Sequence, residues 1–300
     1  MRSAFPALAE RLAGSGVPFR RDVPLGPLTW LGVGGAAPLL IEPRYLDDLD
    51  AALRAASALG VRLEVLGSGA NLFIDDGILP FAVLRLVAPP FKRIEVLEAR
   101  VRSGAGAVLE TLVARVLASD LGGMEGLAGI PASVGGALVM NAGGRHAEIS
   151  ERVASVTVAD AGGLRVLSRA ACGFGYRHSS LHGVTVVSAE FDLVPGDGEA
   201  LRRKAQEIRA AKRESQPLQD ASAGCLFKNP PGQSAGRLID LAGLKGAVQG
   251  RARVSPQHAN FVVNLGGATA DDIRCLIDRV RAEVRRVHGV DLELEVVRWP

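Results

Sequence analysis

Apolar residues recur along this chain with the spacings that distinguish helices from strands. Residues 43–59 carry leucine or alanine every three or four positions, which is the period of a helix with one buried face. Asp47 and Asp48 fall in the first turn of this segment, where negative charge is favourable. Residues 107–118 and 199–214 repeat the period, the second with a basic opposite face. We expect a helix at each segment.

The clearest helix start is at Thr269, which stands three residues before Asp272 in the pattern of a capping box. The apolar face expected behind it consists of Ile273, Leu276, Val280, Val284 and Val287. Cys275 stands near this face and is expected to lie in the core.

Other segments alternate apolar and polar residues with the period of a strand. Residues 61–66 do so directly after the helix stop at Gly60. Residues 153–158 and 164–167 flank a glycine-containing turn and predict a hairpin, and residues 184–193 predict a further strand.

The chain ends on a strict alternation at residues 292–296, which predicts a strand with Glu293 and Glu295 on one face. The sequence character changes at residues 195–198, a Pro-Gly-Asp-Gly stretch typical of a domain boundary. Strands and helices alternate without an internal repeat, so the expected fold class is α+β with two or three subdomains.

Length and composition are those of a globular protein. The chain has 300 residues, of which 48% are hydrophobic and 22% are charged, so it forms a core and general disorder is excluded. The net charge is only +3 and no run of like charges occurs, which gives no support to nucleic-acid binding. No apolar stretch approaches membrane length and no leader is evident, so a cytoplasmic protein is expected, without an evident obligate protein partner.

The three cysteines are about 50 residues apart and lack the spacing of zinc ligands or of a disulfide framework. They are Cys172, Cys225 and Cys275. The five histidines are scattered as well. We therefore expect no metal site.

A glycine-rich turn at residues 67–71 directly follows the strand expected at 61–66. The dinucleotide-binding fingerprint of Rossmann folds fails here: Leu72 replaces the third glycine, residues 72–74 favour a strand over a helix, and no acid follows about 20 residues on. The remaining interpretations are an anion-binding nest of backbone N–H groups or an ordinary turn.

A second glycine-rich segment, residues 126–144, contains no charged residue. Backbone of this kind suits close approach to a flat or phosphorylated ligand, although tight packing between subdomains explains the small residues equally well. Two such segments in one chain favour the ligand interpretation.

Seven short motifs occur in an order that resembles the UDP-N-acetylenolpyruvoylglucosamine reductase (MurB) family. They lie at residues 29–35, 66–71, 129–136, 176–177, 222–230, 258–261 and 294–296. The resemblance runs from about Leu28 to Val297, and the order of the motifs makes it specific although each motif alone is weak.

The resemblance implies an FAD-binding region of the vanillyl-alcohol-oxidase (PCMH) type in two α+β subdomains, at residues 1–86 and 87–197. A C-terminal α+β substrate-binding domain would follow at residues 198–300. The two glycine segments would hold the pyrophosphate of a non-covalently bound FAD, and the residues expected to bind the cofactor are Leu66, Gly67, Ser68, Gly69, Ala70, Asn71, Leu72, Gly129, Ile130, Pro131, Ser133, Val134, Gly135, Gly136 and Ala137.

The resemblance also implies a reaction in which NADPH gives a hydride to the flavin N5, and the hydride then passes to the enolpyruvyl double bond of a UDP-sugar. Arg177 matches a position that stabilises developing negative charge on the carboxylate, and Glu295 one that polarises it. Cys225 stands where many members carry a serine proton donor, and a thiol is the stronger acid.

The residues expected to contact the nucleotide-sugar substrate are Arg213, Lys228, Asn229, His258 and Asn260. The tyrosine-bearing insertion of one family subclass is absent from this sequence. Two alternatives stay open: a flavin oxidase or dehydrogenase of the same cofactor fold, and a nucleotide-sugar sensor without turnover.

Overall fold

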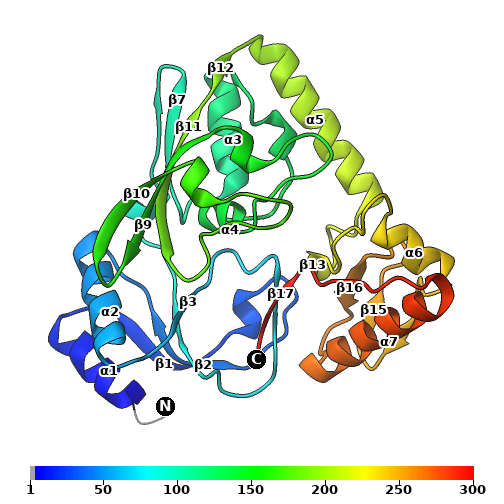
Figure 1. The fold of residues 1–300 in the computed structure, drawn as a ribbon, viewed down its shortest axis with the longest axis horizontal. Helices are drawn as coiled ribbons and strands as arrows, with labels where there is room; N and C mark the ends of the chain where they lie inside the picture. Colours follow the sequence, from blue (N-terminus) through cyan, green and yellow to red (C-terminus); the bar gives the residue numbers. More distant parts are fainter. Residues whose placement is uncertain (1–3) are drawn as a thin grey trace. The chain divides into compact units, whose positions relative to one another are not determined.

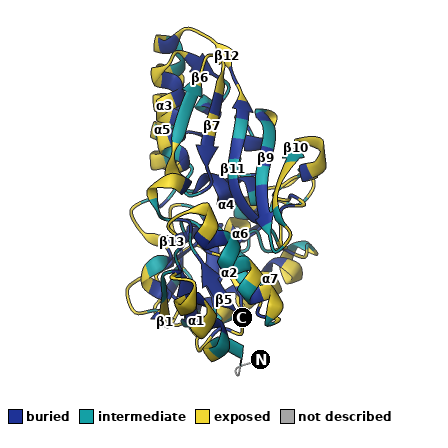
Figure 2. Cartoon of the chain, turned by 90° about the vertical axis from the view of Figure 1, so that its left-hand side faces the viewer, coloured by how far each residue is buried: buried dark blue, intermediate teal, exposed yellow. Residues whose placement is uncertain are grey.

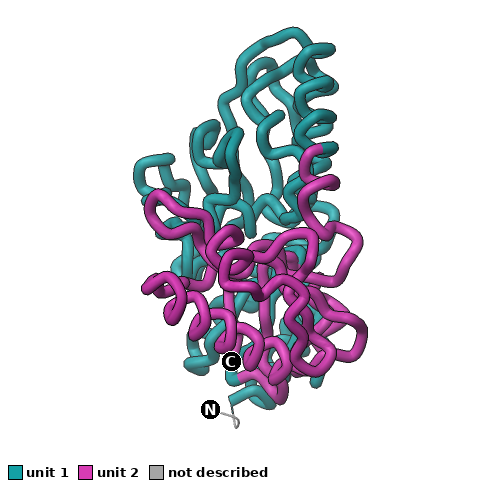
Figure 3. Tube along the Cα trace, turned by 90° about the vertical axis from the view of Figure 1, so that its right-hand side faces the viewer, with its two compact units in different colours: residues 1–23, 37–68, 80–210 teal, residues 24–36, 69–79, 211–300 magenta. Residues whose placement is uncertain are grey.

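The computed structural model describes residues 4–300, so the first residues of the segment inspected for a leader, Met1–Ser3, lie outside the described part. The backbone divides into two compact units, each built from separate stretches of sequence (Figure 3). The first unit holds residues up to Val23 together with residues 37–68 and 80–210. The second holds residues 24–36, 69–79 and 211–300. The expected division at residues 86 and 197 stays a prediction.

One sheet of the first unit has the strand order β1-β2-β5-β3. Its strands are β1 (Phe19–Pro24), β2 (Ala36–Ile41), β5 (Ala82–Leu84) and β3 (Leu63–Val65). Both β2 and β3 run parallel to β5, and β2 is almost wholly buried, as an apolar run in a parallel sheet requires. The helices α1 (Ala4–Gly14) and α2 (Leu46–Ala58) contribute Leu8, Leu12 and Leu49 to the same core.

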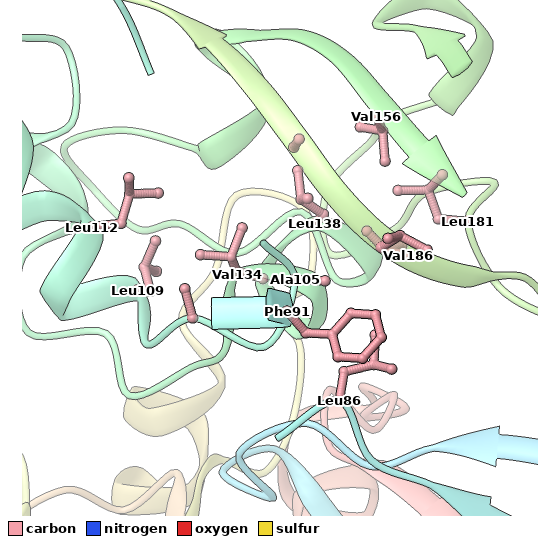
Figure 4. Packing of buried hydrophobic residues seen from close by; sticks show 14 of the residues in the cluster. Leu86, Phe91, Ala105, Leu109, Leu112, Val134, Leu138, Val156, Leu181 and Val186 are labelled. Atoms are coloured by element: carbon pink, nitrogen blue, oxygen red, sulfur yellow. The ribbon is translucent and has the colours of Figure 1, made fainter. Parts of the chain in front are cut away.

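The other large sheet of the first unit is antiparallel, in the order β10-β9-β11-β7-β6 (Figure 1). Its strands are β6 (Ile94–Leu97), β7 (Arg100–Gly104), β9 (Val153–Asp160), β10 (Gly163–Ser168) and β11 (Thr185–Asp192). The helices α3 (Leu109–Ala118) and α4 (Val134–Val139) contribute Leu112 and Leu138 to the buried cluster that contains Val156 and Val186 of this sheet (Figure 4). The edge strand β10 is largely exposed, whereas β7 and β11 are mostly buried (Figure 2).

A short strand pair and most of a long helix complete the first unit. The strands β8 (Leu121–Gly122) and β12 (Val194–Pro195) pair with each other, and α5 (Gly198–Ser215) buries Ala205 and Ile208. The 3₁₀ helices of the chain are η1 (Gly26–Leu28), η2 (Pro89–Lys92), η3 (Glu125–Leu127), η4 (Ile149–Glu151) and η5 (Ala170–Cys172).

The second unit is built on an antiparallel sheet in the order β13-β16-β15-β14. Its strands are β13 (Ala221–Cys225), β14 (Val248–Gln249), β15 (Ala252–Val254) and β16 (Phe261–Asn264). The helices α6 (Ala235–Leu241) and α7 (Ala270–His288) share an apolar core with one face of this sheet. The strands β4 (Leu72–Ile74) and β17 (Val297–Trp299) pair in parallel.

Most of the elements expected from the hydrophobic pattern are confirmed. The helix expected at residues 43–59 begins at Leu46, because Tyr45 is extended and the N–H of Arg44 donates to Asp48. The hairpin is confirmed, with Gly163 opposite Asp160, and Thr269 and Asp272 form both halves of a capping box. The strand expected at residues 61–66 is confirmed in its centre, as β3.

Three expectations about the C-terminal segment are wrong. Residues 292–296 form an isolated bridge between Leu294 and Phe227 instead of a strand, and the regular strand is β17. Val287 is 42% exposed because it lies in the last turn of α7, beyond the sheet core. Cys275 is only partly buried, and its Sγ lies 3.7 Å from the Asp271 carboxylate.

Within residues 4–300, no helix is long and apolar enough to cross a membrane. The same residues contain no group of three or more His, Cys, Asp or Glu side chains able to hold a metal ion.

Candidate functional site

The first glycine turn presents a run of unused backbone donors. The N–H of Leu66 donates to Leu84, but in the described chain, residues 4–300, no N–H from Gly67 to Asn71 donates to a protein acceptor. Gly69 has φ +67°, and a Cβ there would lie 2.5 Å from the carbonyl oxygen of Leu28. Successive N–H groups without protein acceptors form the kind of nest that binds phosphate oxygens.

Gly67 and Ser133, one from each glycine segment, lie side by side in the first unit. A Cβ built on Gly67 would lie 2.4 Å from the Oγ of Ser133, so a larger residue there would have to displace this hydroxyl. The Oγ of Ser133 caps α4 by accepting the N–H of Gly136 at 3.2 Å. The structure therefore brings together two segments that lie more than 60 residues apart in the sequence.

Most backbone N–H groups of the second glycine segment donate to acceptors within the protein. The N–H groups of Val134 and Gly135 donate to Ala107 and Ala105, each at 2.8 Å. The N–H of Gly129 donates at 2.7 Å to the carboxylate of Glu110, which also pairs with Arg209. Close packing thus accounts for part of the glycine content of this segment. Its backbone conformation is fixed by hydrogen bonds to the rest of the protein. The continuous run of unused donors, which suits a diphosphate, lies in the first turn.

Arg177 lies in the first unit and is held in a defined position. Its backbone is left-handed, with φ +53°, and its guanidinium donates to the carbonyl of Gly143 at 2.8 Å. The same group lies 3.8 Å from the Glu148 carboxylate and 4.9 Å from the centre of the Tyr176 ring. Only 14% of the side chain is exposed. Restraint of this kind reduces the conformational freedom that an arginine loses on binding an anion.

Asn141 organises the surroundings of Arg177, and the sequence analysis missed it. The side chain is 1% exposed and donates at 2.9 Å both to Glu148 and to the carbonyl of Gly175. Its Oδ1 accepts the N–H of Ser150 at 3.3 Å. A signal was present, because an asparagine among glycines is a residue type that tolerates the positive φ of 43° seen here.

Cys225 and Glu295 come together in the second unit. The strand β13 is irregular between Ser222 and Cys225, and Gly224 has φ +79°. The carbonyl of Leu226, the residue after Cys225, accepts the N–H of Glu295 at 2.9 Å. Asn71, which belongs to the second unit as well, lies beside Glu295: its side chain donates to the carbonyl of Glu295 at 3.3 Å, and its carbonyl accepts the N–H of Val297 at 3.1 Å.

Two of the expected substrate residues hold the backbone near Cys225. Asn260 is 3% exposed and makes reciprocal hydrogen bonds with the N–H and carbonyl of Phe227, at 3.0 and 2.8 Å. Asn229 accepts the N–H of Ala235 at the start of α6 at 3.0 Å. These contacts fix the loop that follows Cys225.

The other three expected substrate residues differ in their surroundings. The Lys228 ammonium is 2.6 Å from the Glu293 carboxylate. His258 accepts the N–H of Asn260 at 3.2 Å, and burial lowers the pKa of its imidazole below the ordinary value of 6.5. Arg213 lines a pocket with Gln216, Leu218 and Gln257. All five lie in the second unit, as do Cys225 and Glu295, whereas Arg177 belongs to the first.

Family models match most of the chain. A model described as the UDP-N-acetylenolpyruvoylglucosamine reductase C-terminal domain matches residues 216–299, and an FAD binding domain matches residues 37–168. The UDP-N-acetylenolpyruvoylglucosamine reductase of Myxococcus xanthus is 41% identical over 302 residues, covering 99% of this chain and 97% of the relative. That of Moorella thermoacetica is 42% identical and covers 92% and 91%.

Solved structures resemble the chain as well. The crystal structure of UDP-N-acetylenolpyruvylglucosamine reductase (MurB) from Thermus caldophilus aligns with a TM-score of 0.81 and 39% identity, covering 95% of this chain and 99% of that one. A chitooligosaccharide oxidase aligns with a TM-score of 0.50 over 96% of this chain and 60% of its own, at 12% identity. The second likeness concerns the fold alone.

Proposed function

The chain belongs to the UDP-N-acetylenolpyruvoylglucosamine reductase family, and we propose that it reduces UDP-N-acetylglucosamine enolpyruvate to UDP-N-acetylmuramate at the expense of NADPH. It is an FAD-dependent oxidoreductase of peptidoglycan precursor synthesis. The expected α+β fold, with an FAD-binding region of the vanillyl-alcohol-oxidase type, is confirmed. We place its activity in the cytoplasm, as the sequence analysis expects.

The observation that carries the proposal is the row of N–H groups from Gly67 to Asn71. Within the described residues these groups have no protein acceptor, so they are available to the diphosphate of FAD. Gly67 and Ser133 approach each other closely, so the second glycine segment lies beside this turn. We assign cofactor contacts to both segments, with the hydrogen bonds to phosphate coming mainly from the first.

Bound FAD would supply hydride transfer through N5, accepting the hydride from NADPH and delivering it to the enolpyruvyl carbon. The protein has to manage the charge and the proton that this addition leaves on the substrate. Hydride addition to an enol ether that carries a carboxylate moves negative charge toward that carboxylate. A proton must then reach the neighbouring carbon.

Three residues divide this work in the proposed mechanism. Arg177 carries a permanent positive charge and makes a bidentate contact with the substrate carboxylate. Its contacts with Gly143 and Glu148 already restrict the side chain, which lowers the conformational entropy lost when the carboxylate binds. Glu295, in its protonated form, donates a hydrogen bond to the same carboxylate as the charge develops. Cys225 donates the proton, and its thiol becomes a thiolate that takes up a proton from solvent before the next turnover.

The backbone around Cys225 supports a donor held in one position. The backbone of Leu226 donates a hydrogen bond to Asn260 and accepts one from Glu295. The side chain of Asn260 also bonds both the N–H and the carbonyl of Phe227. Lys228, Asn229, His258 and Arg213 remain proposed contacts of the UDP-sugar.

Separate measurement of the two half-reactions tests the assignment. NADPH should reduce the bound flavin in Glu295→Gln and Arg177→Lys at nearly the wild-type rate, whereas reoxidation by the enolpyruvyl UDP-sugar should slow by roughly 100-fold or more. Equal slowing of both half-reactions would remove these residues from the proposed roles. A flavin that reacts with oxygen or another acceptor and ignores the UDP-sugar would favour the oxidase alternative.

A further inference from the structure

Arg253 occupies a central position on the sheet of the second unit. It lies on β15, where its cross-strand partners are Val263 on β16 and Val248 on β14. Directly opposed residues of antiparallel strands point to the same face of a sheet, so these three side chains form one row. The neighbouring residues Ala252 and Val254 point to the opposite face and belong to the apolar core.

Cys225 is on the same face as Arg253. Its cross-strand partner is Phe261, which stands two residues before Val263 on β16 and therefore shares the orientation of Val263. Two strand spacings and two residues along the strand separate Cys225 from Arg253. Standard sheet dimensions then place their Cα atoms about 12 Å apart.

The guanidinium of Arg253 lacks the partners that buried arginines normally have. Its Nε is buried, and among the described residues, 4–300, it has no hydrogen-bond partner. No ion pair between described residues includes this side chain either. Two residues away, Arg251 is exposed and still donates to the carbonyls of Gly266 and Leu265. A buried donor without an acceptor destabilises the folded state, and an external acceptor beside Arg253 would satisfy its Nε.

We propose that Arg253 binds the diphosphate of the nucleotide-sugar substrate, an inference that rests on the proposed function. The guanidinium fork matches two phosphate oxygens in a way that a neutral or single-donor side chain does not. A separation of about 12 Å from Cys225 is too long for contact with the reacting carbons and fits a group farther along an extended substrate. Lys228, another proposed contact of the UDP-sugar, already pairs with Glu293.

The side chain is also accessible to such a ligand. Arg253 itself is only partly buried, and the row on which it stands continues to Val248, which is 48% exposed. A ligand on this face would therefore reach the guanidinium from the open end of the row.

The test measures binding of uridine diphosphate to the FAD-loaded enzyme by calorimetry. Arg253→Met, which keeps the length and loses the charge, should weaken uridine diphosphate binding at least tenfold, because charged hydrogen bonds of this kind are typically worth a factor of ten or more. Arg251→Met is the matched control and should bind it as the wild type does. Flavin reduction by NADPH should be unchanged in both variants.

Undiminished binding of uridine diphosphate by Arg253→Met would overturn the proposal. Normal affinity for uridine diphosphate combined with weakened affinity for the whole substrate would also overturn it, because that result places Arg253 at the carboxylate. If Arg253→Met does not fold, Arg253→Gln provides the same comparison with a polar side chain. Failure of the proposed function is a separate result: the wild-type enzyme would then bind uridine diphosphate without reducing the enolpyruvyl sugar.

Discussion

The carboxylate of Glu148 lies 3.8 Å from the guanidinium of Arg177, and Asn141 donates to that carboxylate from within the core at 2.9 Å. Glu148 thus restrains Arg177, and Asn141 in turn holds the carboxylate of Glu148 in place. If Arg177 stabilises charge on the substrate, its position depends on Glu148.

Glu148→Gln should therefore slow flavin reoxidation by the UDP-sugar by roughly 10- to 100-fold, the cost of a catalytic group displaced by about 1 Å. Flavin reduction by NADPH should stay near the wild-type rate in a stopped-flow measurement. Glu199→Gln alters an exposed carboxylate at the start of α5 and is the control. Reoxidation at the wild-type rate in Glu148→Gln would show that this contact does not position Arg177.

Replacement of Cys225 separates proton donation from a structural role. Cys225→Ala should reduce the rate of substrate-dependent flavin reoxidation by about 10²- to 10⁴-fold, the usual contribution of a general acid, and leave flavin reduction intact. Cys225→Ser should retain more activity than the alanine variant, because a hydroxyl still donates a proton. Alanine and serine variants with the same residual rate would argue against proton donation from this position.

The contact between Gly67 and Ser133 predicts a specific coupling. Gly67→Ala should weaken FAD binding, because the new methyl group would lie 2.4 Å from the Oγ of Ser133 and displace the glycine turn. Gly14→Ala is the control, since Gly14 lies at the end of α1, outside both glycine segments, and nothing lies within 4 Å of a Cβ there.

The double variant with Ser133→Ala tests the cause. Removal of the Oγ leaves only the Cβ of Ser133, at 3.5 Å, so FAD affinity should recover in part in Gly67→Ala with Ser133→Ala. The recovery will be incomplete, because loss of the α4 cap costs about 1 kcal/mol of stability. Strictly additive effects in a fluorescence titration of FAD would contradict the steric explanation.

The fold was predictable where one physical signal decided the structure. The capping box at Thr269 and the hairpin turn at Gly163 are local, and both formed as expected. The strand predicted at residues 292–296 was wrong because strand formation there depends on a distant partner. Its alternation is real, but the partner strand that a ladder needs was not visible in the sequence, and the segment bridges to Phe227 instead.

The candidate site was predictable in part for similar reasons. Family motifs identified Arg177, Cys225 and Glu295, but the side chains that restrain them act through contacts across long sequence distances. Asn141 and Glu148 hold Arg177 from more than 25 residues away, and no local pattern predicts that contact. Arg253 lies in a strand without any motif, and attention is drawn to it by the lack of a partner for its Nε among residues 4–300.

Burial of His258 predicts a pH dependence of stability. Its folded-state pKa is lowered, mainly because burial disfavours the charged imidazole, so the unfolded state binds a proton more readily than the folded state. The stabilising contribution is complete above the unfolded pKa of 6.5 and is lost as the pH falls below it.

His258→Asn removes this titration and keeps an acceptor for the N–H of Asn260. Between pH 7.5 and 5.5 the unfolding free energy of the wild type should fall more than that of the variant, as urea titrations would measure. Equal losses in the two proteins would mean that His258 does not carry the dependence.

The central claim is that a flavin held by the glycine segments reduces an enolpyruvyl UDP-sugar. The most direct measurement reduces the FAD-loaded protein with NADPH in the absence of oxygen, adds UDP-N-acetylglucosamine enolpyruvate, and follows the flavin absorbance. The account predicts rapid return of the oxidised spectrum with stoichiometric formation of UDP-N-acetylmuramate. A flavin that stays reduced after the substrate is added, or a protein that binds no flavin, would contradict it.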